Sequence, residues 1–172
     1  MLNKLRWATV AVVAAIVGML ALAGPAQAVE SVVKYQNGNC IGINDGSIQT
    51  SQPVDMISCS GTKANWGVTT IDSDWNGHPI ARFINKATGL CLDTLGHGLN
   101  QGVWTYACNT GHYQWFEVFT NSNGTRTFKS YAAYYDQGGQ HLCLEDNGNG
   151  LPVTLQTCTS AANQQFTRVG VS

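Results

Sequence analysis

The sequence has 172 residues, nine lysines and arginines against ten aspartates and glutamates, and a net charge of −1. No basic run occurs after the N-terminal segment, which argues against a nucleic-acid partner, because that binding depends on clustered lysine and arginine. The remaining chain is long enough for one compact domain.

The N-terminal segment has the pattern of a secretory signal peptide. Lys4 and Arg6 precede an uncharged apolar run at 8–23, and small residues follow in an A-x-A pattern that ends at Ala28. A transmembrane anchor is the alternative, but the run is shorter than the roughly 20 residues needed to span a bilayer. We therefore expect a signal peptide at 1–28, secretion of residues 29–172, and no membrane span after cleavage.

Short β-prone runs separated by clusters of Gly, Asn, Asp and Pro fill the rest of the chain, and helical periodicity is nearly absent. The pattern predicts an all-β barrel or sandwich. The expected strands are 31–35, 55–58, 66–71, 80–84, 103–107, 115–120, 127–131, 153–156 and 166–169.

Three landmarks repeat with a period of about 50 residues, which is a strong repeat signal. Cys40, Cys91 and Cys143 open the units, and Cys59, Cys108 and Cys158 follow within them. Aromatic residues at 66, 115 and 166 close the units. Three such units, about 29–78, 79–128 and 129–172, predict a β-trefoil, in which the units close around a shared core.

The cysteines are even in number and lie in the predicted secreted part, which favours disulfides. Six cysteines allow 15 pairings. Equivalence of the units would give Cys40–Cys59, Cys91–Cys108 and Cys143–Cys158, one bridge inside each repeat. Zinc is the alternative, but no C-x-x-C pair is present.

The repeat also predicts which side chains point inward. The apolar residues five positions before the second cysteine of each unit should be buried, at Val54, Val103 and Val153. The closing aromatics Trp66, Trp115 and Phe166 should form the floor of the core.

Catalytic and metal signatures are weak. Asp72 to Gly77 matches the opening of a calcium-binding loop, but Phe83 stands where a bidentate Glu is needed, so an inter-unit turn is the better interpretation. No nucleophile, acid–base pair or metal set stands out. We expect no cofactor and no enzymatic activity, and a small hydrolase ranks last among the candidate functions.

The order Cys-Leu-Asp, Val-x-x-x-x-Cys and Gln-x-aromatic resembles the ricin B-type lectin repeat, over nearly the whole predicted mature chain. The resemblance implies a β-trefoil that binds galactose-type sugars or polysaccharides in shallow pockets. It also implies roles for an Asp two residues after the first cysteine, an aromatic two before the second cysteine, and polar residues near the closing motif.

Carried onto the middle unit, the resemblance assigns Asp93 to sugar hydroxyls and Tyr106 to ring stacking. Trp104, four residues before Cys108, falls where the family often has another polar contact, and His112, three residues before Trp115, falls where the family usually has Asn. One departure concerns Gln114. It is adjacent to Trp115 rather than two residues before it, and strand alternation should turn it away from the site. The structural alternative is that Asp93 braces the turn towards Gly96 and that Tyr106 is half-buried packing.

The other units are weaker matches. The third unit has Glu145 in the Asp position and Gln156 in the stacking position, and Asn163 and Gln164 precede its closing aromatic. It offers hydrogen-bonding groups without a ring, so we expect a weaker second site. The first unit has Gly42 and Ile57 at these positions, and we expect it to be structural only.

The resulting hypothesis is a secreted, monomeric, carbohydrate-binding lectin whose best site lies in the middle repeat. The competing hypothesis is a protein-interaction module or protease inhibitor on the same scaffold, because β-trefoil loops present such surfaces and a fold does not fix a function.

Overall fold

The computed structural model describes residues 30–35, 37–44, 51–96 and 98–170, so the predicted signal peptide at 1–28 lies outside the described residues. The chain forms three successive units of four strands. The first contains β1 (Glu30–Tyr35), β2 (Asn39–Ile43), β3 (Ser51–Ser58), the 3₁₀ turn η1 (Thr62–Ala64) and β4 (Trp66–Ser73). The second contains β5 (Pro79–Asn85), β6 (Cys91–Asp93), β7 (Trp104–Tyr106), η2 (His112–Gln114) and β8 (Phe116–Thr120). The third contains β9 (Arg126–Ser130), α1 (Tyr131–Tyr135), β10 (Leu142–Glu145), β11 (Thr154–Thr157), η3 (Ala162–Gln164) and β12 (Phe166–Gly170).

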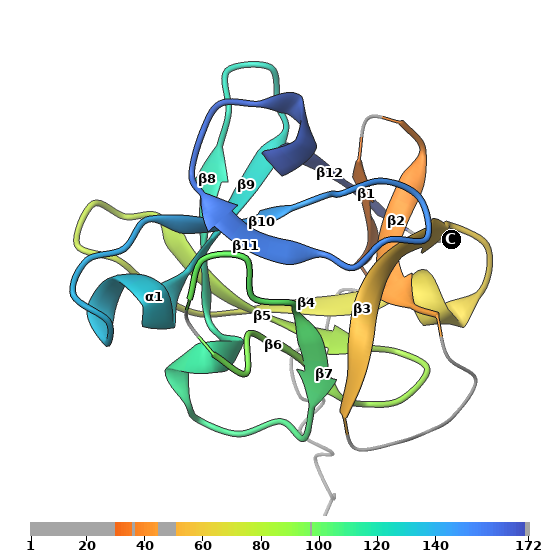
Figure 1. Cartoon of the computed structure of the whole chain (residues 1–172), viewed down its shortest axis with the longest axis horizontal. Coiled ribbons are helices and arrows are strands. Elements are labelled where there is room, and N and C mark those ends of the chain that lie inside the picture. The colour runs from red at the N-terminus through yellow and green to blue at the C-terminus, as the bar shows by residue number, and fades with distance from the viewer. Residues whose placement is uncertain (1–29, 36, 45–50, 97, 171–172) are drawn as a thin grey trace, which may run out of the picture.

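The first and last strands of the units form a barrel. Antiparallel pairing runs from β1 to β12, β9, β8, β5 and β4, and β4 contacts β1 to complete the circuit. The middle strands form the hairpins β2–β3, β6–β7 and β10–β11. These hairpins lie around the centre of the view in Figure 1. This arrangement is the predicted all-β β-trefoil.

The three hairpins are joined by a closed ring of backbone hydrogen bonds. The Val54 N–H donates to the Val103 carbonyl at 2.9 Å, the Val103 N–H to the Val153 carbonyl at 2.9 Å, and the Val153 N–H to the Val54 carbonyl at 2.8 Å. All three valine side chains are fully buried. The prediction that these valines point inward is confirmed.

Aromatic side chains fill the barrel below the valine ring. Phe83 packs edge-on against Phe116 and Phe128, with ring centroids 5.7 and 5.0 Å apart, and Phe128 lies 5.6 Å from Phe166. Trp66 is buried, and its indole N–H donates to the Ile41 carbonyl at 2.8 Å. The predictions for Trp66 and Phe166 are confirmed.

The prediction for Trp115 is wrong. Trp66, Phe116 and Phe166 each begin the last strand of their unit directly after a 3₁₀ turn and its C-cap residue, and all three are buried. Trp115 is the C-cap residue of η2 and is only half-buried, against His112 and Tyr131. The two aromatics are adjacent in sequence, and strand alternation buries Phe116.

All three predicted disulfides are present, as Cys40–Cys59, Cys91–Cys108 and Cys143–Cys158. Their sequence separations are 19, 17 and 15 residues. Loops of this size contribute about 3 kcal/mol each in the chain-entropy model. Each bridge ties the start of a hairpin to the segment that leads into the next 3₁₀ turn.

Besides the three 3₁₀ turns, four elements of the described chain are absent from the predicted list. Three are the cysteine strands β2, β6 and β10, which open the hairpins. The fourth is α1, at whose N-cap the Ser130 hydroxyl accepts the Ala133 N–H. Tyr131, predicted to end a strand, instead begins this helix. No helix in the described part of the chain is long and apolar enough to cross a membrane.

The corrected position of the closing aromatic gives the first prediction. Phe116→Ala should lower the free energy of unfolding by about 3–5 kcal/mol, because it empties part of the core. Trp115→Ala should cost only about 1–2 kcal/mol, because the ring is already partly in water. Urea unfolding of both variants measures the difference. An equal or larger loss for Trp115→Ala would contradict the assignment.

A second prediction concerns Tyr135 on α1, whose hydroxyl donates to Glu117 Oε1 on β8 at 3.3 Å. Desolvation, followed by the nearby Glu117 charge, raises the pKa of Tyr135 from 10.0 to about 12. A pKa raised by folding adds stability that is complete below the unfolded value and is lost as the pH rises towards the folded one. Wild type should therefore lose stability between pH 10 and 12.

Tyr135→Phe should reduce that loss, which thermal unfolding at a series of pH values measures. Tyr113→Phe, which changes another exposed tyrosine away from Glu117, is the matched control. An unchanged pH dependence in Tyr135→Phe would show that Tyr135 does not titrate in this way.

Candidate functional site

The predicted middle site lies on the outer face of the β6–β7 hairpin. Strand pairing places Asp93 opposite Trp104 and Cys91 opposite Tyr106, so these four side chains share one face of the hairpin. Leu92 and Thr105, between them, are buried on the other face. Tyr106 is 42% exposed, which excludes the possibility that its ring points into the core.

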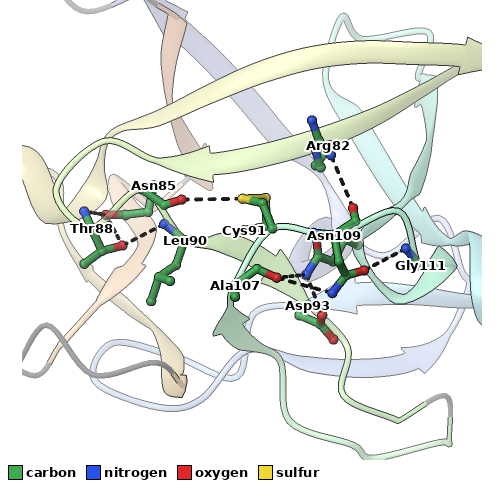
Figure 2. Close-up of a disulfide and its surroundings, with 12 residues drawn as sticks. Arg82, Asn85, Thr88, Leu90, Cys91, Asp93, Ala107, Asn109 and Gly111 are labelled. Atoms are coloured by element: carbon green, nitrogen blue, oxygen red, sulfur yellow. Dashed lines mark hydrogen bonds between the residues drawn. A yellow bond between two sulfur atoms is a disulfide. The ribbon is translucent and has the colours of Figure 1, made fainter.

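Asp93 is a fixed and nearly covered carboxylate, 2% exposed. Its Oδ1 accepts the Leu95 N–H at 2.7 Å, and its Oδ2 accepts the Gln114 side-chain amide at 2.9 Å. Figure 2 shows Asp93 grouped with Ala107 and Asn109 beside the disulfide at Cys91. Asp93 therefore does brace its turn, and with about four lone-pair sites per carboxylate it retains capacity for two further donors.

Gln114 holds this carboxylate in place. Its amide nitrogen also donates to the Ala107 carbonyl at 2.9 Å, and its amide oxygen accepts the Asn109 N–H at 2.9 Å. Gln114 is fully buried. The expectation that Gln114 faces away from the site is therefore wrong. Gln114 belongs to the 3₁₀ turn η2 rather than to a strand, so the strand-alternation argument did not apply to it.

Gln164 makes the same contacts in the third unit. Its amide nitrogen donates to Glu145 Oε2 at 2.7 Å and to the Thr157 carbonyl at 2.9 Å, and its oxygen accepts the Thr159 N–H at 2.7 Å. Gln114 and Gln164 are thus equivalent, each two residues before a buried phenylalanine. The sequence carried this signal as Gln114-Trp115-Phe116, read with Phe116 as the aromatic.

The equivalence of the two glutamines also changes which residue occupies the preceding position of the closing motif in the middle unit. The Thr94 N–H donates to the Tyr113 carbonyl at 3.0 Å, and in the third unit the Asp146 N–H donates to the Asn163 carbonyl at 2.9 Å. Tyr113 therefore takes the Asn position that was assigned to His112, and that assignment of His112 is wrong. Tyr113 is 40% exposed and was missed by the sequence analysis.

His112 is held by the third unit instead. Its Nδ1 lies 3.0 and 3.1 Å from the carboxylate oxygens of Asp136, which follows α1. Its ring packs against Trp115 and Tyr131, at centroid distances of 4.6 and 5.0 Å. His112 thus joins η2 to α1.

The third unit brings together Glu145, Gln156, Asn163 and Gln164. Strand pairing places Glu145 opposite Thr154 and Cys143 opposite Gln156, on one hairpin face. Glu145 is only half-buried, so its carboxylate is more accessible than that of Asp93. The Gln156 amide donates to Asn100 Oδ1 at 2.8 Å, in a loop of the second unit. This site combines an accessible acceptor with amides and has no ring at the stacking position.

In the first unit the corresponding space is filled. A Cβ placed on Gly42 would lie 2.3 Å from Ile57 Cδ1, so no carboxylate fits beside that side chain. Ile57 packs with the Cys40–Cys59 disulfide and Ala64, which occupies the position of Gln114 and Gln164. The geometry agrees with the prediction that this unit is structural only.

Comparison with protein families identifies the class. A ricin-type β-trefoil lectin domain model matches residues 79–170, which are the second and third units. The match covers more than half of the chain, and the chain belongs to this family of carbohydrate-binding domains. The unmatched first unit is the one that lacks the carboxylate and the glutamine. No curated protein sequence gives a significant match.

Solved structures support the fold. The designed three-fold symmetric protein ThreeFoil superposes with a TM-score of 0.70 at 15% identity, covering 83% of this chain and 98% of that one. The exo-β-1,3-galactanase 1,3Gal43A from Clostridium thermocellum gives 0.71 at 15% identity, covering 86% of this chain and 31% of that one. The agglutinin from Abrus precatorius gives 0.58 at 18% identity, covering 81% and 47%. At these identities the similarity establishes the fold alone.

Gln114 gives the third prediction. Gln114→Ala should lower the free energy of unfolding by roughly 2–4 kcal/mol, because it leaves Asp93, the Ala107 carbonyl and the Asn109 N–H short of partners in a buried region. Gln165→Ala is the matched control, since its half-buried side chain bonds Asn123, Thr125 and Ser160 rather than a buried carboxylate. Denaturant unfolding measures both. Similar losses in the two variants would show that Gln114 is not a structural brace.

Proposed function

We propose that this protein is a secreted, non-enzymatic lectin domain that binds galactose-type sugars or a polysaccharide through the β6–β7 face of the middle unit. The observation that carries the proposal is the oriented Asp93 carboxylate on the same hairpin face as the exposed Tyr106 ring. A carboxylate accepts hydrogen bonds from vicinal hydroxyls, and an aromatic face packs on the apolar C–H side of a sugar.

Each residue has a definite part in this proposal. Asp93 accepts sugar hydroxyls while Gln114 keeps it in orientation. Tyr106 stacks on the ring, and Trp104 contributes contact area beside Asp93. Tyr113, exposed on η2, replaces the amide expected there and supplies another aromatic edge.

The third unit is proposed as a weaker second site. Glu145 and Gln164 reproduce the carboxylate and its brace, and Gln156 and Asn163 add amides. Without a ring to stack on, binding there rests on hydrogen bonds that exchange with water at little net gain. One shallow site should have a dissociation constant in the millimolar to micromolar range, which corresponds to a binding free energy of about 4–8 kcal/mol. A monomer would gain avidity only if both sites engage one multivalent surface.

The fourth prediction tests the middle site by glycan array and by pull-down with insoluble polysaccharides. Tyr106→Ala should lose most binding without a change in melting temperature, because the ring is exposed. Asp93→Asn keeps the shape of the carboxyl group but replaces one acceptor oxygen with a donor, and it should weaken binding at least tenfold, about 1.4 kcal/mol. Leu151→Ala, an exposed apolar residue on the β10–β11 turn, is the control.

The outcomes separate the competing functions. If Tyr106→Ala and Asp93→Asn both bind glycans as the wild type does, the middle unit is not the sugar site. A folded wild-type protein that binds no glycan would reject the lectin function and favour the protein-interaction module or protease inhibitor.

A further inference from the structure

A cavity of about 480 Å³ lies apart from both hairpin sites. It is bounded by the β4–β5 turn, the β8–β9 hairpin, α1 and the Cys143–Cys158 disulfide. In Figure 1 the yellow-green β4–β5 turn and the blue-green α1 both lie at the left of the barrel. The cavity lining includes none of the side chains proposed to bind sugar at the two hairpin sites, although Cys143 and Thr159 of the third unit form part of its wall. Its volume falls within the roughly 300–1,000 Å³ typical of small-molecule sites.

The cavity exists because the units are not identical. Residues 131–141 connect β9 to β10 and include α1, whereas the equivalent connection from β5 to β6 uses only residues 86–90. The longer connection brings Tyr134 and Tyr135 to the cavity wall, opposite Phe119 of β8. The middle unit has no counterpart of this helix, so the cavity is not one of three repeated pockets.

Trp75 stands at the rim and is 90% exposed. The turn that carries it is fixed by Asp74, whose Oδ1 accepts the N–H groups of Asn76 and His78 at 3.0 and 2.6 Å. The other carboxylate oxygen lies 2.8 Å from His78 Nδ1. Asp74 thus acts as a turn former, as the sequence analysis favoured over a calcium ligand. The indole contributes almost no buried area to folding, so core stability does not account for a tryptophan here.

Lys129 and the carboxylates of Glu117 and Asp74 line the cavity, and Asp74 is already bonded to N–H groups of its own turn. Lys129 forms an ion pair with Glu117, and their side chains are only 9% and 1% exposed. The Lys129 ammonium lies 4.1 Å from the Tyr134 ring centroid, and Tyr135 donates to Glu117. A buried ion pair rarely adds to stability relative to apolar residues of the same volume. It does provide a donor and an acceptor side by side without a net charge.

These features define the ligand that the cavity suits. The Lys129–Glu117 pair carries no net charge, and the Asp74 carboxylate is engaged by the Asn76 and His78 N–H groups, so an uncharged ligand suits the wall better than an ion. Aromatic faces suit a ring with an apolar side. Hydrogen-bonding groups of both kinds suit hydroxyls, which donate and accept. We propose that this cavity is an additional binding site for a neutral saccharide ring, with Trp75 stacking on the sugar and the Lys129–Glu117 pair bonding its hydroxyls. The inference rests on the proposed carbohydrate function for its class of ligand, and not on the hairpin sites.

The test compares single variants on the same probes, a glycan array followed by titration of the glycans that bind. Trp75→Ala should weaken the binding of at least one glycan about tenfold, which is equivalent to about 1.4 kcal/mol. Trp75→Phe should restore most of that binding, because it keeps a ring. Ser160→Trp, which fills the cavity from an exposed position on its wall, should also reduce binding. Leu151→Ala is the control, and equal melting temperatures show that all variants are folded.

The result also separates this site from the middle unit. If Trp75→Ala loses binding to a glycan that Tyr106→Ala still binds, the proposed cavity site is supported, even if the hairpin site proves wrong. If only Tyr106→Ala loses glycan binding, and Trp75→Ala and Ser160→Trp bind every glycan as the wild type does, the cavity proposal is wrong and the proposed function still stands. No glycan binding by the wild-type protein overturns both.

Discussion

The ring of three backbone hydrogen bonds at Val54, Val103 and Val153 is the constraint on which the structure depends. Each valine donates to one neighbour and accepts from the other, so removing any one hairpin leaves two buried backbone groups without partners. The ring therefore couples the three hairpins, although each is closed by its own disulfide. With the inner face fixed in this way, the outer faces of the hairpins are free to differ.

A second repeated feature distinguishes the outer faces of the hairpins. Gln114 and Gln164 each bond a carboxylate, a carbonyl and an N–H, so the carboxylate is oriented before any ligand arrives. Ala64 stands at this position in the first unit, and Ile57 fills the space that the carboxylate would need. The loss of the glutamine and the loss of the carboxylate in the first unit go together. A glutamine at position 64 without a carboxylate to bond would be a buried amide that lacks a partner.

The sequence predicted the fold well because the trefoil repeats its strongest constraints. Cysteines and valines recur with one period, and the disulfides and the buried ring follow from that period. The cysteine strands β2, β6 and β10 were missed because nearly all their residues are buried, so their sequences show no alternation of apolar and polar residues. Trp115 was chosen over Phe116 as the closing aromatic of the middle unit, and this choice is wrong. The repeat of about 50 residues fixes that position only to within one residue, so either aromatic satisfies it. The contacts of Gln114 decide between them, and the Gln-x-aromatic spacing counted to Phe116 is the matching signal in the sequence.

The cavity could not be predicted, since its wall joins Trp75, Lys129 and Tyr134 from segments far apart in the sequence. Repeat analysis also works against finding it, because such analysis searches for what the units share. In a scaffold whose symmetric features are explained by the core, the departures from symmetry need another explanation. The helix α1 adds an exposed tyrosine and brings aromatic rings beside the buried Lys129–Glu117 ion pair, without a counterpart in the middle unit. Features that add little to stability and occur in a single repeat are better explained by a ligand than by the fold.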